Sequence, residues 1–408
     1  MTGSQPGRQA RKERPSQKAL RLYRSRKKAI FLKTRLDYDR AKQFFMLPGC
    51  YRKIRAIKDC GRSRTGLAFD LLTWFFSFKT FPNHYGLCRL WEVDRKEWKY
   101  YYGSNYLPHQ LARLKRFVQP LEYRVLFNDK YVCVLICQAL GFRTPKTYGV
   151  LDPALDYRAQ IDGWLDASSE HQLIIKPLFG EMGRDIVVAM RAEGGPVIRT
   201  KQKSSPLKDY VLGEKAIVQD IVSQDARMAV FSSGSVNTIR VVTMLTPQNE
   251  VLIVNAIFRS GVGSAFIDNW SAGGVAVGVD CANGRLLKYA YDKNSNRYLT
   301  HPESGVVFED SPVPEWDRIC ALATAVQRAF PFYRLLGLDM AIDRTGEPVI
   351  IEINGAPDLG GGEQMAGPML QHEAVVRAFG EYGLLVNKHQ RKLYADLDGR
   401  DTVDGERR

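Results

Sequence analysis

The sequence predicts an α+β protein, on three observations. Residues 335–358 hold two apolar runs separated by Asp343-Arg344-Thr345-Gly346, a pattern typical of a β-hairpin. Two β-branched runs, Val236–Leu245 and Val251–Phe258, follow each other closely, as neighbouring strands do. Apolar residues at helical spacing indicate an amphipathic helix at residues 314–330, just before the hairpin. Helices and closely connected strands in one chain define this class.

The composition is that of a globular protein of two or three domains. Of 408 residues, 45% are hydrophobic and 11% aromatic, which is enough for sizeable cores. The seven cysteines lack the spacing of metal-binding pairs, so we expect free thiols in a reducing compartment. No signal peptide is visible, and the most apolar early run, Gly66–Phe78, is too short to span a bilayer and contains Asp70. We expect a soluble, cytoplasmic protein.

The net charge of +15 is concentrated at the N-terminus, where residues 1–36 carry twelve Lys or Arg against the single acid Glu13. Residues 1–17 have no apolar periodicity and are expected to be disordered, whereas a helical period runs from Ala19 to Met46. This basic region is either a solvated, solubilising tail or a helix that lies on an anionic surface. We favour a peripheral position at the inner face of a membrane over nucleic acid, since no nucleic-acid motif is present.

Residues 50–120 are rich in aromatic side chains and show little β alternation, so we predict a small helical lobe with an aromatic core. A Gly-rich turn between strand and helix, typical of dinucleotide-binding folds, is absent from this segment. The segment is therefore not a Rossmann domain.

The next predicted helix begins at Asn128 or Asp129 and ends at Gly141. Lys130 lies in its first turn, where a cation opposes the helix dipole. Lys130 is either an ordinary surface lysine or the partner of a nearby anion.

A second lysine lies in a predicted strand, loop and strand at Gln172–Met190. Lys176 ends the apolar first strand, and Gly180 and Gly183 allow a flexible flap whose backbone N–H groups can face phosphate oxygens. The segment lacks the P-loop pattern, so any phosphate binding here takes another form.

Two arginines interrupt the following strands. Ala216–Val222 is predicted to be a strand that leads into a turn at Asp225, and Arg240 lies inside the next strand. Arg259 ends the strand after that and opens a glycine-rich loop to Gly274, which is typical of a lid. Each arginine is expected to have a fixed anionic partner, either a carboxylate of the protein or a bound phosphate.

Three predictions concern the rest of the chain. His301 lies in a loop and is expected to be structural more often than catalytic. After the hairpin, Gly360-Gly361-Gly362 leads into a helix near Glu373–Phe379. The polar segment from Lys388 is expected to be frayed.

The hairpin brings Asp339 to the same face as Glu352 and Asn354, provided that its loop has an even number of residues. A four-residue loop at 343–346 and a two-residue loop at Thr345-Gly346 both satisfy this condition. Two carboxylates and an amide at one place either hold a hard cation such as Mg²⁺ or form a solvated strand face.

Together these residues resemble the ATP-grasp fold over residues 120–370. The resemblance is carried by Asp129 and Lys130 opening a helix, Lys176 before Pro177, the glycine flap, and Asp339 followed by Glu352-x-Asn354. The run at residues 235–243, the Asp-Asn-Trp-Ser-Ala-Gly-Gly loop at residues 268–274 and the aromatic N-terminal lobe are most similar to the sugar-transfer-associated members.

The lid loop carries a further similarity. Glutathione-synthetase-like members of the fold also have an arginine before an Asn-x-x-x-Gly-Gly lid, as Arg259 and Asn269 do here. The resemblance therefore implies that Arg240, Arg259 and Asn269 serve catalysis.

The resemblance also implies where a nucleotide is held. Lys130, Lys176, Gly180 and Gly183 would contact the phosphates of ATP, and adenine would lie near Gln219 to Val222, a range that includes Asp220. Asp225 is similar to the acid that holds the ribose. Gln219 stands where many members have Glu, which leaves carboxylate recognition of the adenine amine in doubt. Asp339, Glu352 and Asn354 would bind Mg²⁺, two ions by the family pattern, or Mn²⁺.

The implied domain order is a basic tail and helix (1–36), a helical lobe (37–120), two ATP-grasp lobes (121–222 and 223–385) and a polar tail (386–408). The implied reaction joins small-molecule or glycan carboxylate and amine substrates through an acyl phosphate, in cell-surface polysaccharide or glycoconjugate formation. Alternatives are a phosphotransferase acting on a hydroxyl and a nucleotide-binding scaffold without turnover.

Overall fold

The computed structural model describes residues 40–57, 59–80, 82–103, 114–180, 185–200, 203–263, 273–385 and 387–405. The chain divides into two compact units, Met1–Gly49 and Cys50–Arg408, and each is described by itself. In the first unit, residues 40–49 are helical, so the helix runs beyond its predicted end at Met46. No helix among the described residues is both long and apolar enough to cross a membrane.

The second unit begins with a helical, aromatic region, as predicted. Its elements are α2 (Arg64–Thr73), η1 (Trp74–Phe78), α3 (Pro82–Leu87), η2 (Leu90–Glu92), η3 (Glu97–Tyr100), η4 (Leu114–Val118) and η5 (Leu121–Tyr123). Trp74, Tyr85 and Trp98 are fully buried, and the ring of Trp98 lies edge-on to the other two. These rings form the predicted aromatic core.

A six-stranded antiparallel sheet follows, in the order β1-β6-β2-β3-β4-β5. Its strands are β1 (Thr147–Leu151), β2 (Gln172–Pro177), β3 (Val187–Ala192), β4 (Gly195–Arg199), β5 (Ser204–Pro206) and β6 (Ala216–Asp220). The helices beside it are α5 (Val125–Asn128), α6 (Lys130–Ala139) and α7 (Tyr157–Ala167), with the turn η6 at Leu207–Asp209. Helix α7 packs on the face that carries Leu173, Ile175 and Val218.

A seven-stranded antiparallel sheet forms the second half, in the order β11-β10-β9-β8-β7-β12-β13. Its strands are β7 (Thr238–Leu245), β8 (Val251–Ser260), β9 (Val275–Val279), β10 (Leu286–Tyr291), β11 (Arg297–Tyr298), β12 (Leu335–Ile342) and β13 (Pro348–Asn354). The short α8 (Ala226–Ala229) lies between the two sheets in the chain, and η8 (Met369–Gln371) follows the second.

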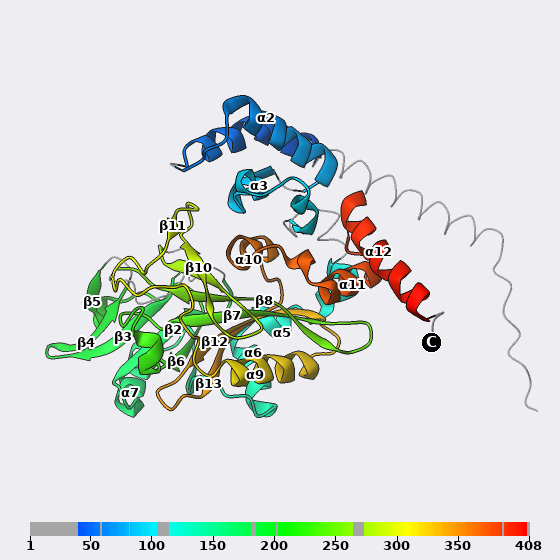
Figure 1. Cartoon of the computed structure of the whole chain (residues 1–408). Helices are drawn as coiled ribbons and strands as arrows, with labels where there is room; N and C mark the ends of the chain where they lie inside the picture. Colours follow the sequence, from blue (N-terminus) through cyan, green and yellow to red (C-terminus); the bar gives the residue numbers. More distant parts are fainter. Residues whose placement is uncertain are drawn as a thin grey trace, which may run out of the picture. The chain divides into compact units, whose positions relative to one another are not determined.

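Helices cover both faces of the larger sheet (Figure 1). Helix α9 (Trp316–Ala329) packs on one face against a core that includes Val241 and Leu338. Helices α10 (Leu359–Ala366), α11 (Glu373–Glu381) and α12 (Lys388–Gly405) share a core with Val242 on the other face. Neighbouring residues of a strand point to opposite faces, so Val241 and Val242 contribute to different cores.

The helix predicted near Glu373–Phe379 is α11, whereas the prediction for the segment from Lys388 is wrong. Gly360-Gly361-Gly362 is helical within α10, because Asp358 caps that helix by accepting the N–H of Gly360. Residues from Lys388 form α12, although we expected them to be frayed. Asn387 accepts the N–H of Gln390, and Leu397 is buried, so a cap and packing order this polar segment.

A buried carboxylate joins the early aromatic region to α10. The side chain of Glu363 accepts the backbone N–H groups of Tyr102 at 2.7 Å and Gly103 at 2.9 Å, and it lies 3.0 Å from Nε2 of His84. All three partners precede residue 104, whereas Glu363 follows the last strand of the larger sheet. These contacts make the early helical region part of the same compact unit.

Candidate nucleotide and metal site

Asp339 and Glu352 face each other across the β12–β13 hairpin, as predicted, but the predicted loop lengths are wrong. Five residues, 343–347, connect the two strands, which is an odd number. Met340 pairs with Ile350, whereas Asp339 pairs with Glu352, so Ile351 is the extra residue of a β-bulge. Without the bulge, the odd loop would turn Glu352 to the opposite face.

Two arginines converge on Asp339. Nη2 of Arg240 donates to Oδ2 of Asp339 at 2.5 Å, and Nη2 of Arg259 lies 2.6 Å from Oδ1. Burial by itself would raise the pKa of Asp339, but the two guanidiniums outweigh burial and lower the pKa to about 2. Asp339 is therefore ionised and holds two positive charges at one place.

Strand register explains this arrangement. Arg240 on β7 pairs with Asp339 on β12, and Thr238 on β7 pairs with Arg259 on β8. The Nε of Arg259 donates to Oγ1 of Thr238 at 3.2 Å, which helps to fix its direction. Both arginines have the anionic partner that we predicted, and that partner is the protein carboxylate.

Lys130, at the start of α6, lies beside this cluster. Asp129 caps α6 by accepting the N–H groups of Tyr131 and Val132, as predicted, so Lys130 lies in the first turn. Its Nζ lies 3.5 Å from Oε1 of Glu352 and donates to the backbone O of Gly180 at 2.9 Å. Lys130 thus has an anionic neighbour and contacts the start of the flap.

Lys176 and Gln219 form a second polar pair, on β2 and β6. Nζ of the buried Lys176 donates to Oε1 of Gln219 at 3.1 Å, and Nε2 of Gln219 donates to Oγ1 of Thr147 at 3.0 Å. Asp220 instead accepts hydrogen bonds from Tyr148 and Ser168. Because successive strand residues point to opposite faces, Asp220 lies away from the Lys176–Gln219 pair.

Asp225 has a structural task at the start of α8. Its side chain accepts the backbone N–H of Arg227 at 2.7 Å and forms an ion pair with the guanidinium of Arg227 at 2.8 Å. The Arg227 side chain lowers the pKa of Asp225 below its ordinary value. A ribose held by Asp225 would share this carboxylate with Arg227.

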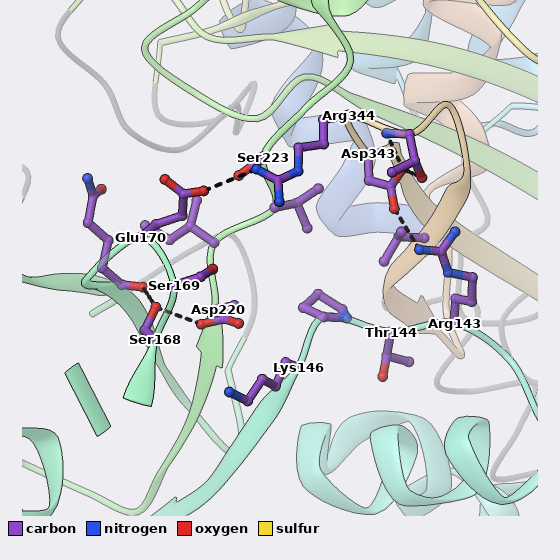
Figure 2. Close-up of a pocket in the computed structure, with 16 residues that line it drawn as sticks. Arg143, Thr144, Lys146, Ser168, Ser169, Glu170, Asp220, Ser223, Asp343 and Arg344 are labelled. Carbon is purple, nitrogen blue, oxygen red and sulfur yellow. Dashed lines mark hydrogen bonds and ion pairs between the residues drawn. The ribbon is translucent and has the colours of Figure 1, made fainter. Parts of the chain in front are cut away.

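A cavity of about 330 Å³ lies beside the segment that joins the two sheets (Figure 2). Asp220 and Val222 line it, but Lys176 and Gln219 do not. Arg143 is paired with Asp343 at 2.7 Å and Arg344 with Glu170 at 3.4 Å around its rim. The cavity therefore lies on the Asp220 side of β6, so the residues that the resemblance places near adenine are divided between this cavity and the Lys176–Gln219 side.

The sequence did not reveal the residues that fix the corner after Asn354. Nε2 of Gln119 donates to the backbone O of Gly355 at 2.6 Å and to that of Leu335 at 3.2 Å. The hydroxyl of Tyr333 also donates to the O of Gly355 at 2.6 Å. No local pattern identifies these contacts, because they depend on the tertiary packing of distant segments.

Asn255 is a further residue that the sequence did not single out. Its side chain is buried, and neither Nδ2 nor Oδ1 has a hydrogen-bond partner among the residues that the structure describes. It lies against Gly362 in the first half of α10, on the strand that also carries Arg259. Gly183 and Asn269, which the resemblance assigned to the flap and the lid, lie outside the described residues.

The donor atoms of the cluster fit a hard divalent cation when a ligand supplies further oxygens. Glu352, whose side chain is 33% exposed, and Asn354 lie on the face of Asp339. Within the described ranges, no group of three or more His, Cys, Asp or Glu side chains could hold a metal ion. Since Mg²⁺ takes six oxygens, two carboxylates and an amide leave positions for phosphate and water.

This geometry, two antiparallel sheets with Lys176 on a strand of one, Lys130 in helix α6 and the carboxylate cluster on the other sheet, defines an ATP-grasp protein. The chain belongs to the sugar-transfer-associated ATP-grasp family, whose profile matches residues 109–377. A search of curated proteins found no match.

Solved structures with a similar arrangement include D-alanyl-alanine synthetase A from Vibrio cholerae, with 13% identity and a TM-score of 0.38 over 66% of each chain. L-amino acid ligase from Bacillus licheniformis has 14% identity and a TM-score of 0.34, over 59% of this chain and 43% of that one. N5-carboxyaminoimidazole ribonucleotide synthetase from Thermotoga maritima has 12% identity and a TM-score of 0.34, over 64% of this chain and 50% of that one. This chain thus spans about half the length of the latter two.

Proposed function

We propose that the protein is an Mg²⁺- and ATP-dependent ligase that joins a carboxylate to an amine. The main support is the pair of guanidiniums held on Asp339 beside Lys130 and Glu352. These side chains comprise three cations and two carboxylates, so the cluster has a net positive charge. Such a cluster favours an anionic substrate and the charge that develops during phosphoryl transfer.

The proposed reaction has two steps. A carboxylate oxygen bonds to the γ-phosphorus of ATP while the bond from that phosphorus to ADP breaks, which gives an acyl phosphate. The amine nitrogen then bonds to the acyl carbon, the carbon–oxygen bond to phosphate breaks, and the nitrogen loses a proton. Amide, ADP and phosphate are the products.

The residues have separate tasks in this proposal. Lys130 and Lys176 bind the phosphates, while Arg240 and Arg259 orient the anionic groups that react. Asp339, Glu352 and Asn354 would hold Mg²⁺, which when bound stabilises charge on the transferred phosphoryl group. The family's association with sugar transfer supports a carboxylate or amine carried by a glycan, in polysaccharide or glycoconjugate formation.

The test measures ADP and phosphate with panels of carboxylates and amines. A ligase releases both in equal amounts, only when both substrates are present, and ¹⁸O from a labelled carboxylate appears in the phosphate. A phosphotransferase would release ADP without phosphate, and a scaffold would bind nucleotide without turnover. Turnover that survives Asp339→Asn and Glu352→Gln would contradict the assigned site.

A further inference from the structure

The outer face of α2 and η1 exposes a row of large apolar side chains. Phe69, Leu72 and Phe76 are 57%, 44% and 61% exposed, and we call these three residues the apolar stripe. Their spacing of three and four residues places them on one side of a continuous helical segment. The opposite side carries Leu67 and Trp74, which are buried in the core.

The apolar stripe is not interrupted by charge. Asp70 is the single charged residue between Arg64 and Lys79, and its side chain points inward. There it accepts hydrogen bonds from Arg62, Arg95 and the hydroxyl of Tyr85. A helix that packs on a soluble protein normally carries charged side chains on its outer face.

Basic residues outnumber acids in the segment of the chain that carries the apolar stripe. Residues 50–80 contain seven Lys or Arg and two acids, Asp59 and Asp70. Both acids are paired, Asp70 as described above and Asp59 with Arg89 at 2.6 Å and Arg297 at 2.8 Å. The guanidinium of Arg95 lies 4.8 Å from the ring centre of Phe69, so a cation borders the stripe itself.

We propose that the apolar stripe docks on a membrane surface rich in anionic phospholipid. Aromatic and aliphatic side chains on one face of a helix, bordered by Lys and Arg, are the features of helices that lie in the membrane interface. Anionic headgroups attract the nearby Lys and Arg side chains. The three side chains of the apolar stripe move from water into the boundary between headgroups and acyl chains. This proposal concerns a surface separate from the ligase site and does not depend on the ligase activity.

Charge argues against two other occupants of the apolar stripe. A second copy of the chain would bring the same basic residues to a symmetric contact, where like charges repel. Residues 1–36 carry twelve basic residues and one acid, so this segment is also repelled. An anionic partner meets neither difficulty.

The test uses the full-length protein and sedimentation with vesicles of phosphatidylcholine, with or without phosphatidylglycerol. The triple variant Phe69→Ser, Leu72→Ser, Phe76→Ser keeps every charge, including those of the N-terminal region. Its partition coefficient on the anionic vesicles should fall on the order of 100-fold, since each apolar side chain withdrawn from water contributes up to about a factor of ten. Leu155→Ser is the matched control, because Leu155 is 59% exposed elsewhere on the unit.

A second measurement does not depend on loss of binding. In the variant Phe76→Trp, brominated lipid should quench tryptophan fluorescence more than it does in the wild type, whereas Leu155→Trp should show no added quenching. Equal binding by the triple variant and the wild type overturns the proposal, and so does equal binding to both kinds of vesicle. A wild-type dimer that the triple variant converts to monomer, without vesicle binding, shows instead that a second copy covers the stripe.

Discussion

Asp339 and Glu352 meet across the hairpin because two irregularities compensate each other. The five-residue connection would offset the strands by one residue, and the bulge at Ile351 offsets them back. The facing of these carboxylates therefore depends on the bulge as well as on the turn. A change in loop length alone would not separate the two carboxylates. They would separate only if the pairing of Asp339 with Glu352, on the far side of the bulge from the loop, also shifted.

Replacing Asp339 should reduce stability and activity together. Asp339→Asn removes the negative charge between Arg240 and Arg259, which leaves two partly buried cations without their carboxylate. We expect a loss of about 3 kcal/mol in the free energy of unfolding, measured with urea at pH 7. Asp166→Asn, at an exposed pair with Arg191, is the control and should cost less than about 1 kcal/mol.

The same carboxyl predicts a dependence on pH. The folded pKa of Asp339 is about 2, below its ordinary value of 3.8, so the unfolded chain binds this proton more readily. The stabilisation is complete above pH 3.8 and is lost as the pH falls towards 2, in total about 2.5 kcal/mol. As the pH is lowered from about 5 to 2, the free energy of unfolding of the wild type in urea should therefore approach that of Asp339→Asn. A constant difference between them over this range would contradict the assignment.

Lys176 should contribute to nucleotide affinity. Lys176→Met removes a buried cation beside Gln219, and we expect the Kd for ADP in calorimetry to rise about 10- to 100-fold. Lys146→Met is the control, because Lys146 is exposed and borders the cavity on the Asp220 side of β6. An equal loss of affinity in both variants would place the nucleotide elsewhere.

Gly362 should tolerate no side chain. A Cβ at this position would lie 2.5 Å from Nδ2 of the buried Asn255, so Gly362→Ala should destabilise the protein by about 2 kcal/mol in thermal or urea unfolding. Adding Asn255→Ala should recover part of the loss. Gly163→Ala in α7, where a Cβ meets no described atom within 4 Å, should instead stabilise by about 0.5 kcal/mol.

Gln119 should position β13, the strand that carries the proposed metal ligands Glu352 and Asn354. Gln119→Met removes the donors to the backbone O atoms of Leu335 and Gly355, at a cost of about 2 kcal/mol in urea unfolding. We also expect kcat to fall more than KM changes, because Asn354 directly precedes Gly355. Gln138→Met, which loses one long exposed hydrogen bond, should behave as the wild type in both measurements.

The sequence was most informative where local rules decide the structure. The cap at Asp129 and the stop at Gly141 placed α6, and a β-branched run placed β13. These features depend on residues close in the chain. They also located the two lysines and the hairpin acids on their elements.

Tertiary contacts decided what the sequence could not show. Gly360, Gly361 and Gly362 lie in α10, a helix that we did not predict, where the space beside Gly362 is filled by Asn255. The joint pairing of Arg240 and Arg259 with Asp339 depends on the register of three strands. Periodicity along one strand carries no information about which residue of a distant strand lies opposite.

The contacts of Glu363 bear on how the protein unfolds. Its carboxylate joins Tyr102 and Gly103, which precede the family match at residue 109, to a helix within that match. Removal of the early region would leave a buried negative charge without these donors, at a cost of several kcal/mol. Residues 50–103 and the two sheets should therefore unfold in one cooperative transition. The start of the family match at residue 109 is thus not the start of a separate folding unit.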